Sequence, residues 1–158
     1  MAPGGAGEKM ENRLEKFLVD EGLVPAEKME QALLVSRQKH KPLLRVLLDG
    51  QIADEEAVLR AVAKHQDVRF INLKDTKVGD AAVKTVSARF VSHYLVMPVS
   101  FDGTVLTIAV SDPFDMSAME DIQASLGLRV ERAFACRGDI AEAIRKYYGI
   151  GADTDIIV

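Results

Sequence analysis

The fold is decided by two consecutive stretches, RLEKFLVDEGLVPAEKMEQALLVS at residues 13–36 and PLLRVLLDGQIADEEAVLRAVAKH at residues 42–65. The two align without a gap, so that Leu18 of the first falls on Leu47 of the second. Each predicts a short helix, a turn that contains glycine, and a longer helix. One such hairpin alone leaves an apolar face exposed, which a second copy can cover. The pattern therefore predicts an internal duplication.

Helix boundaries are marked in both copies. In the first, apolar residues recur at three- and four-residue spacing up to Gly22, a common helix end, and Pro25 stands where the next helix begins. In the second, Gly50 ends the short helix and Asp54 is placed to cap the longer one.

Beyond residue 66 the apolar spacing changes from helical to strand-like. An apolar run, Asp102-Gly103 and a β-branched run predict a β-hairpin. The predicted fold class is α+β: a duplicated helical hairpin lobe followed by a small α/β lobe with a three- to four-stranded sheet and flanking helices. The predicted elements are a strand at 68–73, one or two helices over 83–94, strands at 96–99 and 104–110, a helix over 116–126, a strand at 128–135, and a helix that opens at Asp139 and ends near Tyr147.

These elements predict a domain organisation. The boundaries are a flexible tail at 1–9, the helical lobe at 10–73, a hinge at 74–80, the α/β lobe at 81–149, and a linker at 150–158. The polar stretch 74–80 contains Gly79, which favours a hinge, although a rigid loop between packed lobes would have the same composition.

Composition restricts the class of protein. The 158 residues are 48% hydrophobic and 28% charged with a net charge of −4, as in globular proteins. No apolar run reaches the roughly 20 residues of a membrane-spanning helix, and no secretory signal is recognisable at the start. The acidic balance argues against general nucleic-acid binding. A single cysteine, Cys136, fits a reducing compartment.

Catalytic and metal-binding patterns are not recognisable. No glycine-rich stretch followed by lysine is suited to hold phosphate, so ATP hydrolysis by this chain is not expected. The histidines His40, His65 and His93 are scattered, which favours surface positions over metal ligands. Cys136 is interpreted as a small, buried apolar side chain at a strand end. We therefore predict no enzyme, no metal and no catalytic residue in this chain.

Three groups of residues carry a resemblance to a known family. The first is the repeated unit, from Arg13-Leu14 to Leu33. The second is the stretch 42–73. The third combines Ala88-Arg89-Phe90, Met97-Pro98-Val99, Ser111-Asp112-Pro113 and Tyr147-Tyr148-Gly149. In order and spacing they resemble the N-terminal region of the ATPases that power type II secretion and type IV pilus assembly.

The resemblance implies function and partners. In that family the region precedes an ATPase core, so the chain is expected to be an isolated N-terminal domain. It is expected to dock the cytoplasmic part of an inner-membrane platform protein, which would place it in the cytoplasm at the inner membrane face. The alternative is a sensor domain that binds cyclic di-GMP, the one possible ligand, and regulates the ATPase.

The resemblance also implies ligand-binding positions, which are all in the first copy. They are Arg13, Leu14, Leu18, Gly22, Leu23, Met29 and Leu33. The family pattern has glycine after Arg-Leu, a second arginine, and a closing glutamine in each copy. This chain has Glu15 and Leu44 for the glycines, Pro42 for the second arginine, and Ser36 and His65 for the glutamines. One cation fewer and one anion more predict weaker binding of a dianionic ligand. Without a ligand, the apolar positions are expected to be core residues and Arg13 a solvated side chain.

Overall fold

The computed structural model describes residues 14–149. The predicted tail, the predicted linker and Arg13 lie outside these residues. Contacts divide the chain into two compact units, Met1–Val58 and Leu59–Val158. The boundary falls inside a helix of the second copy. The domain limits predicted from the sequence stay predictions, and each unit is described by itself.

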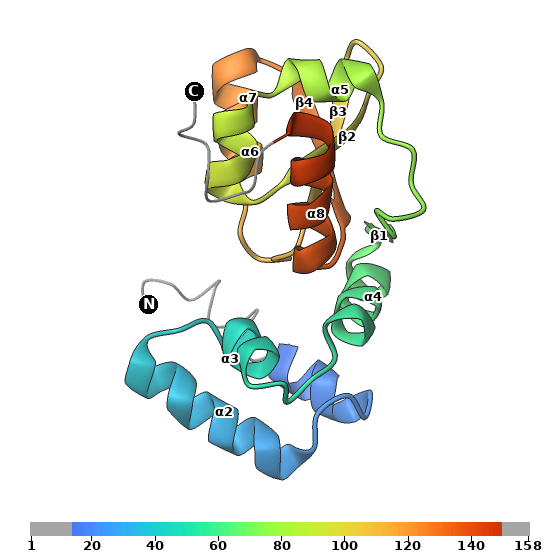
Figure 1. Ribbon diagram of the computed structural model, residues 1–158. Helices are drawn as coiled ribbons and strands as arrows, with labels where there is room; N and C mark the ends of the chain where they lie inside the picture. The colour runs from blue at the N-terminus through green and yellow to red at the C-terminus, as the bar shows by residue number, and fades with distance from the viewer. Residues whose placement is uncertain (1–13, 150–158) are drawn as a thin grey trace. The chain divides into compact units, whose positions relative to one another are not determined.

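The first unit is helical (Figure 1). It contains a helical segment at 14–20, α2 (Ala26–Lys39), α3 (Leu43–Asp49) and the start of α4 (Glu55–Gln66). Helices α2 and α3 contact each other. Apolar side chains from all four segments form its core, chiefly Leu14, Leu18, Met29, Leu43, Leu47 and Val58.

The helix starts follow the sequence signals. Pro25 and Pro42 precede α2 and α3 with φ of −61° and −58°, close to the value that proline favours. Asp54 precedes α4, and its Oδ2 accepts a hydrogen bond from the Ala57 N–H at 3.0 Å. The capping role predicted for Asp54 is therefore confirmed.

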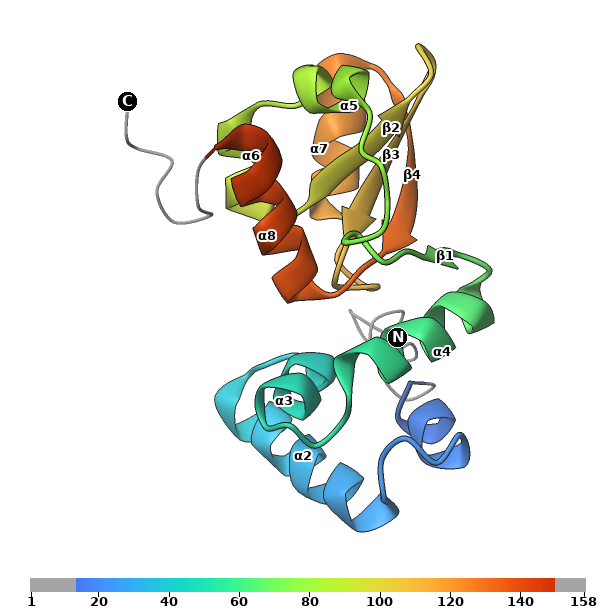
Figure 2. The ribbon, with the colours of Figure 1, turned by 45° about the vertical axis from the view of Figure 1, so that its right-hand side comes forward.

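The second unit is an α/β domain that holds, within the described residues, a four-stranded sheet in the order β1-β4-β3-β2. Strands β2 and β3 are antiparallel, whereas β4 is parallel to both β3 and β1. In Figures 1 and 2, α8 runs alongside the sheet, where it contacts β2 and β3. The elements are β1 (Arg69–Phe70), α5 (Asp80–Thr85), α6 (Ala88–Tyr94), β2 (Met97–Phe101), β3 (Val105–Val110), α7 (Ser117–Leu126), β4 (Arg129–Phe134) and α8 (Arg137–Tyr148). The predicted α+β class is confirmed.

The hairpin was predicted correctly. Asp102 Oδ1 accepts hydrogen bonds from the N–H groups of Thr104 and Val105 at 2.8 and 2.7 Å, and Gly103 has φ of +96°. All residues of β3 from Leu106 to Val110 are buried, so both faces of this strand are covered.

Several boundaries were wrong. Helix α5 begins at Asp80 and not at 83, and β2 extends to Phe101, past the predicted end at 99. The strand predicted over 68–73 is limited to β1, because the chain turns away after one hydrogen bond from Ile71 N–H to the Phe134 carbonyl. The last helix begins at Arg137 instead of Asp139, with Cys136 as its N-cap. Cys136 is half-buried, so it is not the fully buried residue that was expected.

A tyrosine attaches the end of α8 to the rest of the domain. The Tyr148 hydroxyl lies 3.0 Å from the Val83 carbonyl oxygen and 2.9 Å from that of Val86. Burial raises the pKa of Tyr148 to about 12, so the phenol keeps its donor proton at neutral pH. The contact joins α8 to α5 and to Val86, the residue that follows α5.

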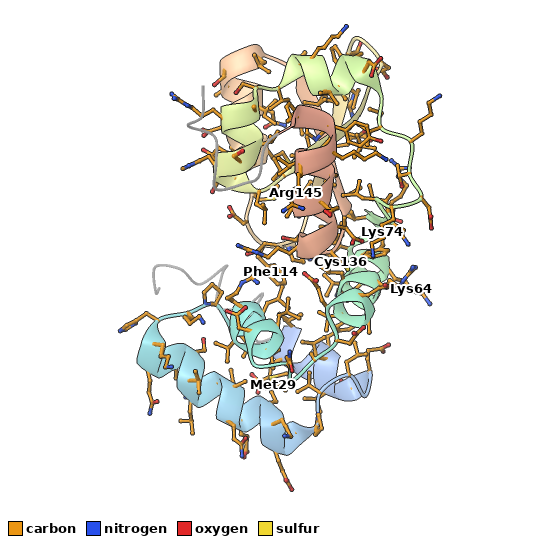
Figure 3. The ribbon with its side chains drawn as sticks, in the orientation of Figure 1. Met29, Lys64, Lys74, Phe114, Cys136 and Arg145 are labelled. Carbon is orange, nitrogen blue, oxygen red and sulfur yellow. The ribbon has the colours of Figure 1, made fainter. Side chains whose placement is uncertain are left out.

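The segment predicted as a hinge has contacts to the α/β domain. Val78 is buried, and the Gly79 N–H donates to the Val99 carbonyl at 2.9 Å. Lys74 Nζ lies 3.7 Å from Asp139 Oδ1 of α8 (Figure 3). The hinge itself stays a prediction.

Within residues 14–149, no helix combines the length and apolarity that crossing a bilayer requires. The same residues contain no group of three or more His, Cys, Asp or Glu side chains that could hold a metal ion. The three histidines are exposed, as the sequence predicted.

Candidate functional site

The predicted ligand positions lie in one local region, the first helix-turn-helix copy. Leu14 and Leu18 come from the segment 14–20, and Gly22 and Leu23 from the turn after it. Met29 and Leu33 come from α2. Arg13 is outside the described residues, so the structure says nothing of its side chain.

Burial separates these positions into two groups. Leu14, Leu18 and Met29 (the last labelled in Figure 3) are 5%, 0% and 2% exposed, and they belong to the core. Leu23 and Leu33 are half-buried, and Gly22 is exposed. Only the second group presents surface that a ligand could touch.

The first turn has a defined backbone geometry. The N–H groups of Leu23 and Val24 both donate to the Leu18 carbonyl, at 2.9 and 3.3 Å, and the Gly22 N–H donates to Val19 at 3.0 Å. A Cβ added at Gly22 would meet nothing within 4 Å. The backbone at Gly22 is therefore open to solvent.

The second turn repeats this geometry. The N–H groups of Ile52 and Ala53 both donate to the Leu47 carbonyl, at 2.9 and 3.3 Å, and the Gln51 N–H donates to Leu48 at 3.1 Å. Each bond is the counterpart of one in the first turn in the gapless alignment. The duplication is thus present in the backbone as well as in the sequence.

The left-handed position is shared although the residue differs. Gly22 has φ of +74°, and Gln51, its counterpart, has φ of +55°. Non-glycine residues adopt this conformation at a cost of about 1–2 kcal/mol. Gly50, the glycine seen in the sequence, is displaced by one position and has φ of −83°.

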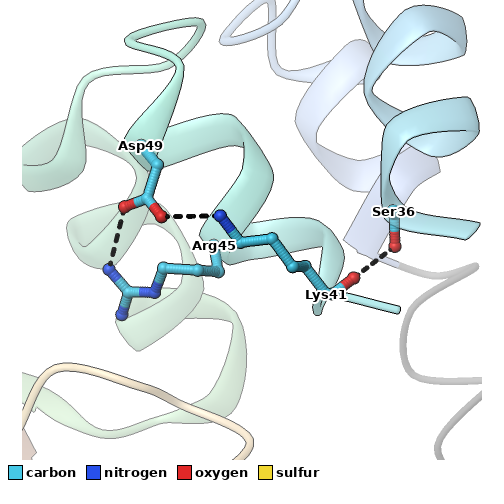
Figure 4. A network of polar contacts seen from close by, with 4 residues as sticks. All are labelled: Ser36, Lys41, Arg45 and Asp49. Carbon is cyan, nitrogen blue, oxygen red and sulfur yellow. Dashed lines mark hydrogen bonds and ion pairs between the residues drawn. The ribbon is translucent and has the colours of Figure 1, made fainter. Parts of the chain in front are cut away.

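A charged network follows the first copy, and the sequence analysis missed it (Figure 4). Lys41 Nζ lies 3.1 Å and Arg45 Nη1 3.6 Å from the carboxylate of Asp49. The hydrogen bond from Lys41, together with both charges, lowers the pKa of Asp49. Ser36 Oγ donates to the Lys41 carbonyl at 2.5 Å. The i,i+4 spacing of Arg45 and Asp49 was the available signal, whereas the contact with Lys41 depends on the fold.

The departures from the family pattern have structural consequences. Leu44, in place of a glycine, is 4% exposed and belongs to the core. Pro42, in place of an arginine, precedes α3, and the neighbouring cations Lys41 and Arg45 are paired with Asp49. The second copy therefore presents no glycine surface at Leu44, and these two cations share the one carboxylate of Asp49.

Comparison with known proteins agrees with this architecture. The duplicated helical motif followed by an α/β domain is the arrangement expected for the N-terminal regions of pilus and secretion ATPases. Residues 66–154 match the MshEN domain, which is more than half of the chain. The chain belongs to the MshEN domain family.

Among curated relatives, the chain is 29% identical over 139 residues to the type IV pilus assembly ATPase PilB of Myxococcus xanthus. The alignment covers 88% of this chain but 25% of PilB. It is also 20% identical over 135 residues to the bacteriophage adsorption protein B of Escherichia coli, 18% of which is covered. The chain thus spans a quarter or less of the length of these relatives.

Two solved structures share the fold. MshE with cdg (cyclic di-GMP) has a TM-score of 0.75 and 26% identity, covering 85% of this chain and 98% of that one. The N-terminal domain of XpsE has a TM-score of 0.59 and 18% identity, covering 87% and 96%.

Proposed function

We propose that this domain docks a secretion or pilus-assembly ATPase onto the cytoplasmic part of an inner-membrane platform protein, and that it acts by binding and not by catalysis. The proposal places the domain in the cytoplasm, at the inner membrane face. The observation that carries it is the similarity to PilB over 88% of this chain, together with membership in the MshEN family.

The α/β unit offers two positions at which a docking role can be tested. Met116 and Leu126, at the two ends of α7, are 36% and 48% exposed. A charge placed at an exposed apolar position would disturb a contact with another protein that covers it. In the helical unit, Leu34 of α2 is 56% exposed, so it can serve as the control position for Met116 and Leu126.

The test is a titration of the purified domain with the cytoplasmic fragment of the platform protein from the same organism. We expect a saturable complex that Met116→Lys and Leu126→Lys weaken at least fivefold. Leu34→Lys introduces the same charge into the other unit and should leave the affinity within twofold. No complex at about 100 μM protein, a concentration that would reveal an interaction of about 5 kcal/mol, would refute docking.

A second function, cyclic di-GMP sensing, is supported by the similarity to MshE solved with cdg. The two matching turns offer exposed backbone at Gly22 and at Gln51. Glycine in such a turn lets a ligand approach the backbone closely. Against tight binding stand Glu15 and the pairing of Lys41 and Arg45 with Asp49, because a phosphate would have to displace that carboxylate.

Calorimetric titration with cyclic di-GMP tests the sensor function, with GMP as the control ligand. Binding near micromolar that Arg13→Ala abolishes is the expected result for a sensor. Asp49→Asn should tighten it, because it frees two cations for phosphate. No heat up to about millimolar ligand would remove this function and leave docking untouched.

A further inference from the structure

A half-buried arginine in the α/β unit has no counter-ion among residues 14–149. Arg132 lies on β4, and its Nη1 donates to the Pro113 carbonyl at 2.7 Å. Its Nη2 donates to Gln66 Oε1 at 3.4 Å, and its Cζ lies 5.1 Å from the centre of the Phe134 ring. Segments far apart in the sequence therefore hold the guanidinium in one place.

All of these partners are neutral. In the part of the chain from 14 to 149, no carboxylate lies within ion-pair distance of Arg132. Burial lowers the pKa of Arg132, because desolvation disfavours the charged form, yet an arginine stays protonated. A desolvated cation without a counter-ion is unfavourable, and an anion that binds there would recover part of the cost.

Aromatic rings and a second guanidinium lie on the neighbouring elements. Phe134 is the register partner of Phe70 on β1, so the two rings occupy neighbouring strands on the same face of the sheet. The guanidinium of Arg60 lies over the Phe70 ring, 4.4 Å from its centre. Glu131, the adjacent acidic residue of β4, projects to the other face, because side chains alternate along a strand.

We propose that Arg132 is a binding site for a carboxylate, supplied by an Asp or Glu side chain of a partner protein. The guanidinium has five N–H donors, of which Pro113 and Gln66 occupy two. The remaining donors lie in one plane and match the two oxygens of a carboxylate. The inference rests on the proposed docking function and names the chemistry that the partner must present.

A carboxylate fits better than a phosphate. One guanidinium balances one negative charge, whereas a phosphate carries close to two and needs further donors. The polar atoms recorded beside Arg132, the Pro113 carbonyl and Gln66 Oε1, are acceptors, which would repel additional anionic oxygens. The site therefore favours a carboxylate over a phosphate, both by charge and by the number of hydrogen-bond donors.

The test is an NMR titration with an N-acetylated tetraglutamate amide as the probe and inorganic phosphate in a second arm. We expect saturable shifts at Arg132, Gln66 and the loop at Pro113 with the peptide, and none with phosphate. Arg132→Gln should weaken peptide binding at least tenfold. Arg129→Gln removes an exposed arginine from the same strand and should change it less than twofold.

Three outcomes would overturn the inference: no saturable peptide binding, equal weakening by Arg132→Gln and Arg129→Gln, or phosphate binding as strong as that of the peptide. Arg132→Lys is the second variant in case Arg132→Gln does not fold. It keeps the charge but loses the planar fork, so at least fivefold weaker binding is expected.

Platform titration separates this inference from the docking function. If the platform fragment binds Arg132→Gln as tightly as the unchanged domain, the carboxylate site is wrong and docking stands. If no platform fragment binds but the peptide still depends on Arg132, docking is wrong and the carboxylate site stands.

Discussion

The first helical copy, residues 14–39, and the second, residues 43–66, share a backbone but differ in the side chains that stabilise it. Both turns direct two N–H groups to one leucine carbonyl and contain one left-handed residue. The first copy has glycine at that residue and proline before α2. The second has Gln51 there, an aspartate cap before α4 and a charged network at its start.

This difference shows which features the motif requires. Buried apolar positions and left-handed backbone are common to both copies, so they belong to the fold. Among residues 14–149, side-chain caps and ion pairs occur in one copy only, so they are local means of stabilisation. The predictions below vary each feature in both copies, starting with the largest expected effect.

The largest effect is expected at the two equivalent core leucines. Leu18 and Leu47 are both 0% exposed. Leu18→Ala and Leu47→Ala should each destabilise the protein by about 2–5 kcal/mol, because each leaves a cavity. Urea unfolding followed by far-UV circular dichroism measures this, since the chain has no tryptophan.

Leu34→Ala is the control, because Leu34 is exposed and should change stability by about 0.5 kcal/mol or less. If Leu18→Ala lowers the free energy of unfolding and Leu47→Ala does not lower it comparably, the two copies are not structurally equivalent.

Substitutions at the left-handed position are expected to change the stability of the protein in opposite directions in the two copies. Gly22→Ala should cost about 1 kcal/mol, since the strain of a Cβ there exceeds the entropy that alanine removes from the unfolded chain. Gln51→Gly should stabilise by about 0.5 kcal/mol for the converse reason. Thermal unfolding of both variants measures the two effects.

Gln31→Gly, at an exposed position within α2, should instead cost about 1 kcal/mol, as glycine does inside a helix. If Gln51→Gly is as destabilising as this control, Gln51 is not in the left-handed conformation.

Much of this fold could be predicted because its signals are local. The duplication, the caps at Pro25 and Asp54, and the hairpin at Asp102-Gly103 each depend on residues close in sequence. The start of α8 was missed because Asp139, where the helix was predicted to open, lies within its first turn. Acidic side chains are favoured throughout the first turn, so an aspartate alone does not fix the first residue of a helix.

The candidate site was less predictable. The family resemblance implied ligand contacts for Leu14, Leu18 and Met29, but apolar spacing does not distinguish a core face from a ligand face. Their burial needed the structure. The contacts of Arg132 join residues 19 and 66 positions apart, and no sequence pattern indicates such contacts.

A smaller effect is expected at the helix caps. Asp54→Ala should cost about 1 kcal/mol, because the Ala57 N–H loses its acceptor. Pro25 makes no side-chain cap, so Pro25→Asp should stabilise α2 by up to about 1 kcal/mol. Thermal melts of both variants provide the measurement, and a gain from Asp54→Ala would contradict the observed cap.

The smallest effect is a pH dependence at the charged network of the second copy. The pKa of Asp49 is lowered by its hydrogen bond with Lys41 and by the nearby charges. A carboxyl group whose pKa is lower in the folded state stabilises the fold above its unfolded pKa of about 3.9, and this contribution is lost as pH falls through the folded pKa. Asp49→Asn should therefore lower the melting temperature slightly at pH 7, and the difference from the unchanged protein should vanish in acid below pH of about 3.

Added salt should also reduce this difference in melting temperature, because the side chains of the network are exposed. Asp20, the counterpart of Asp49 in the first copy, has no ion pair within residues 14–149, so Asp20→Asn is the matched control. Equal pH profiles for the two variants would mean that the network does not distinguish the copies in solution.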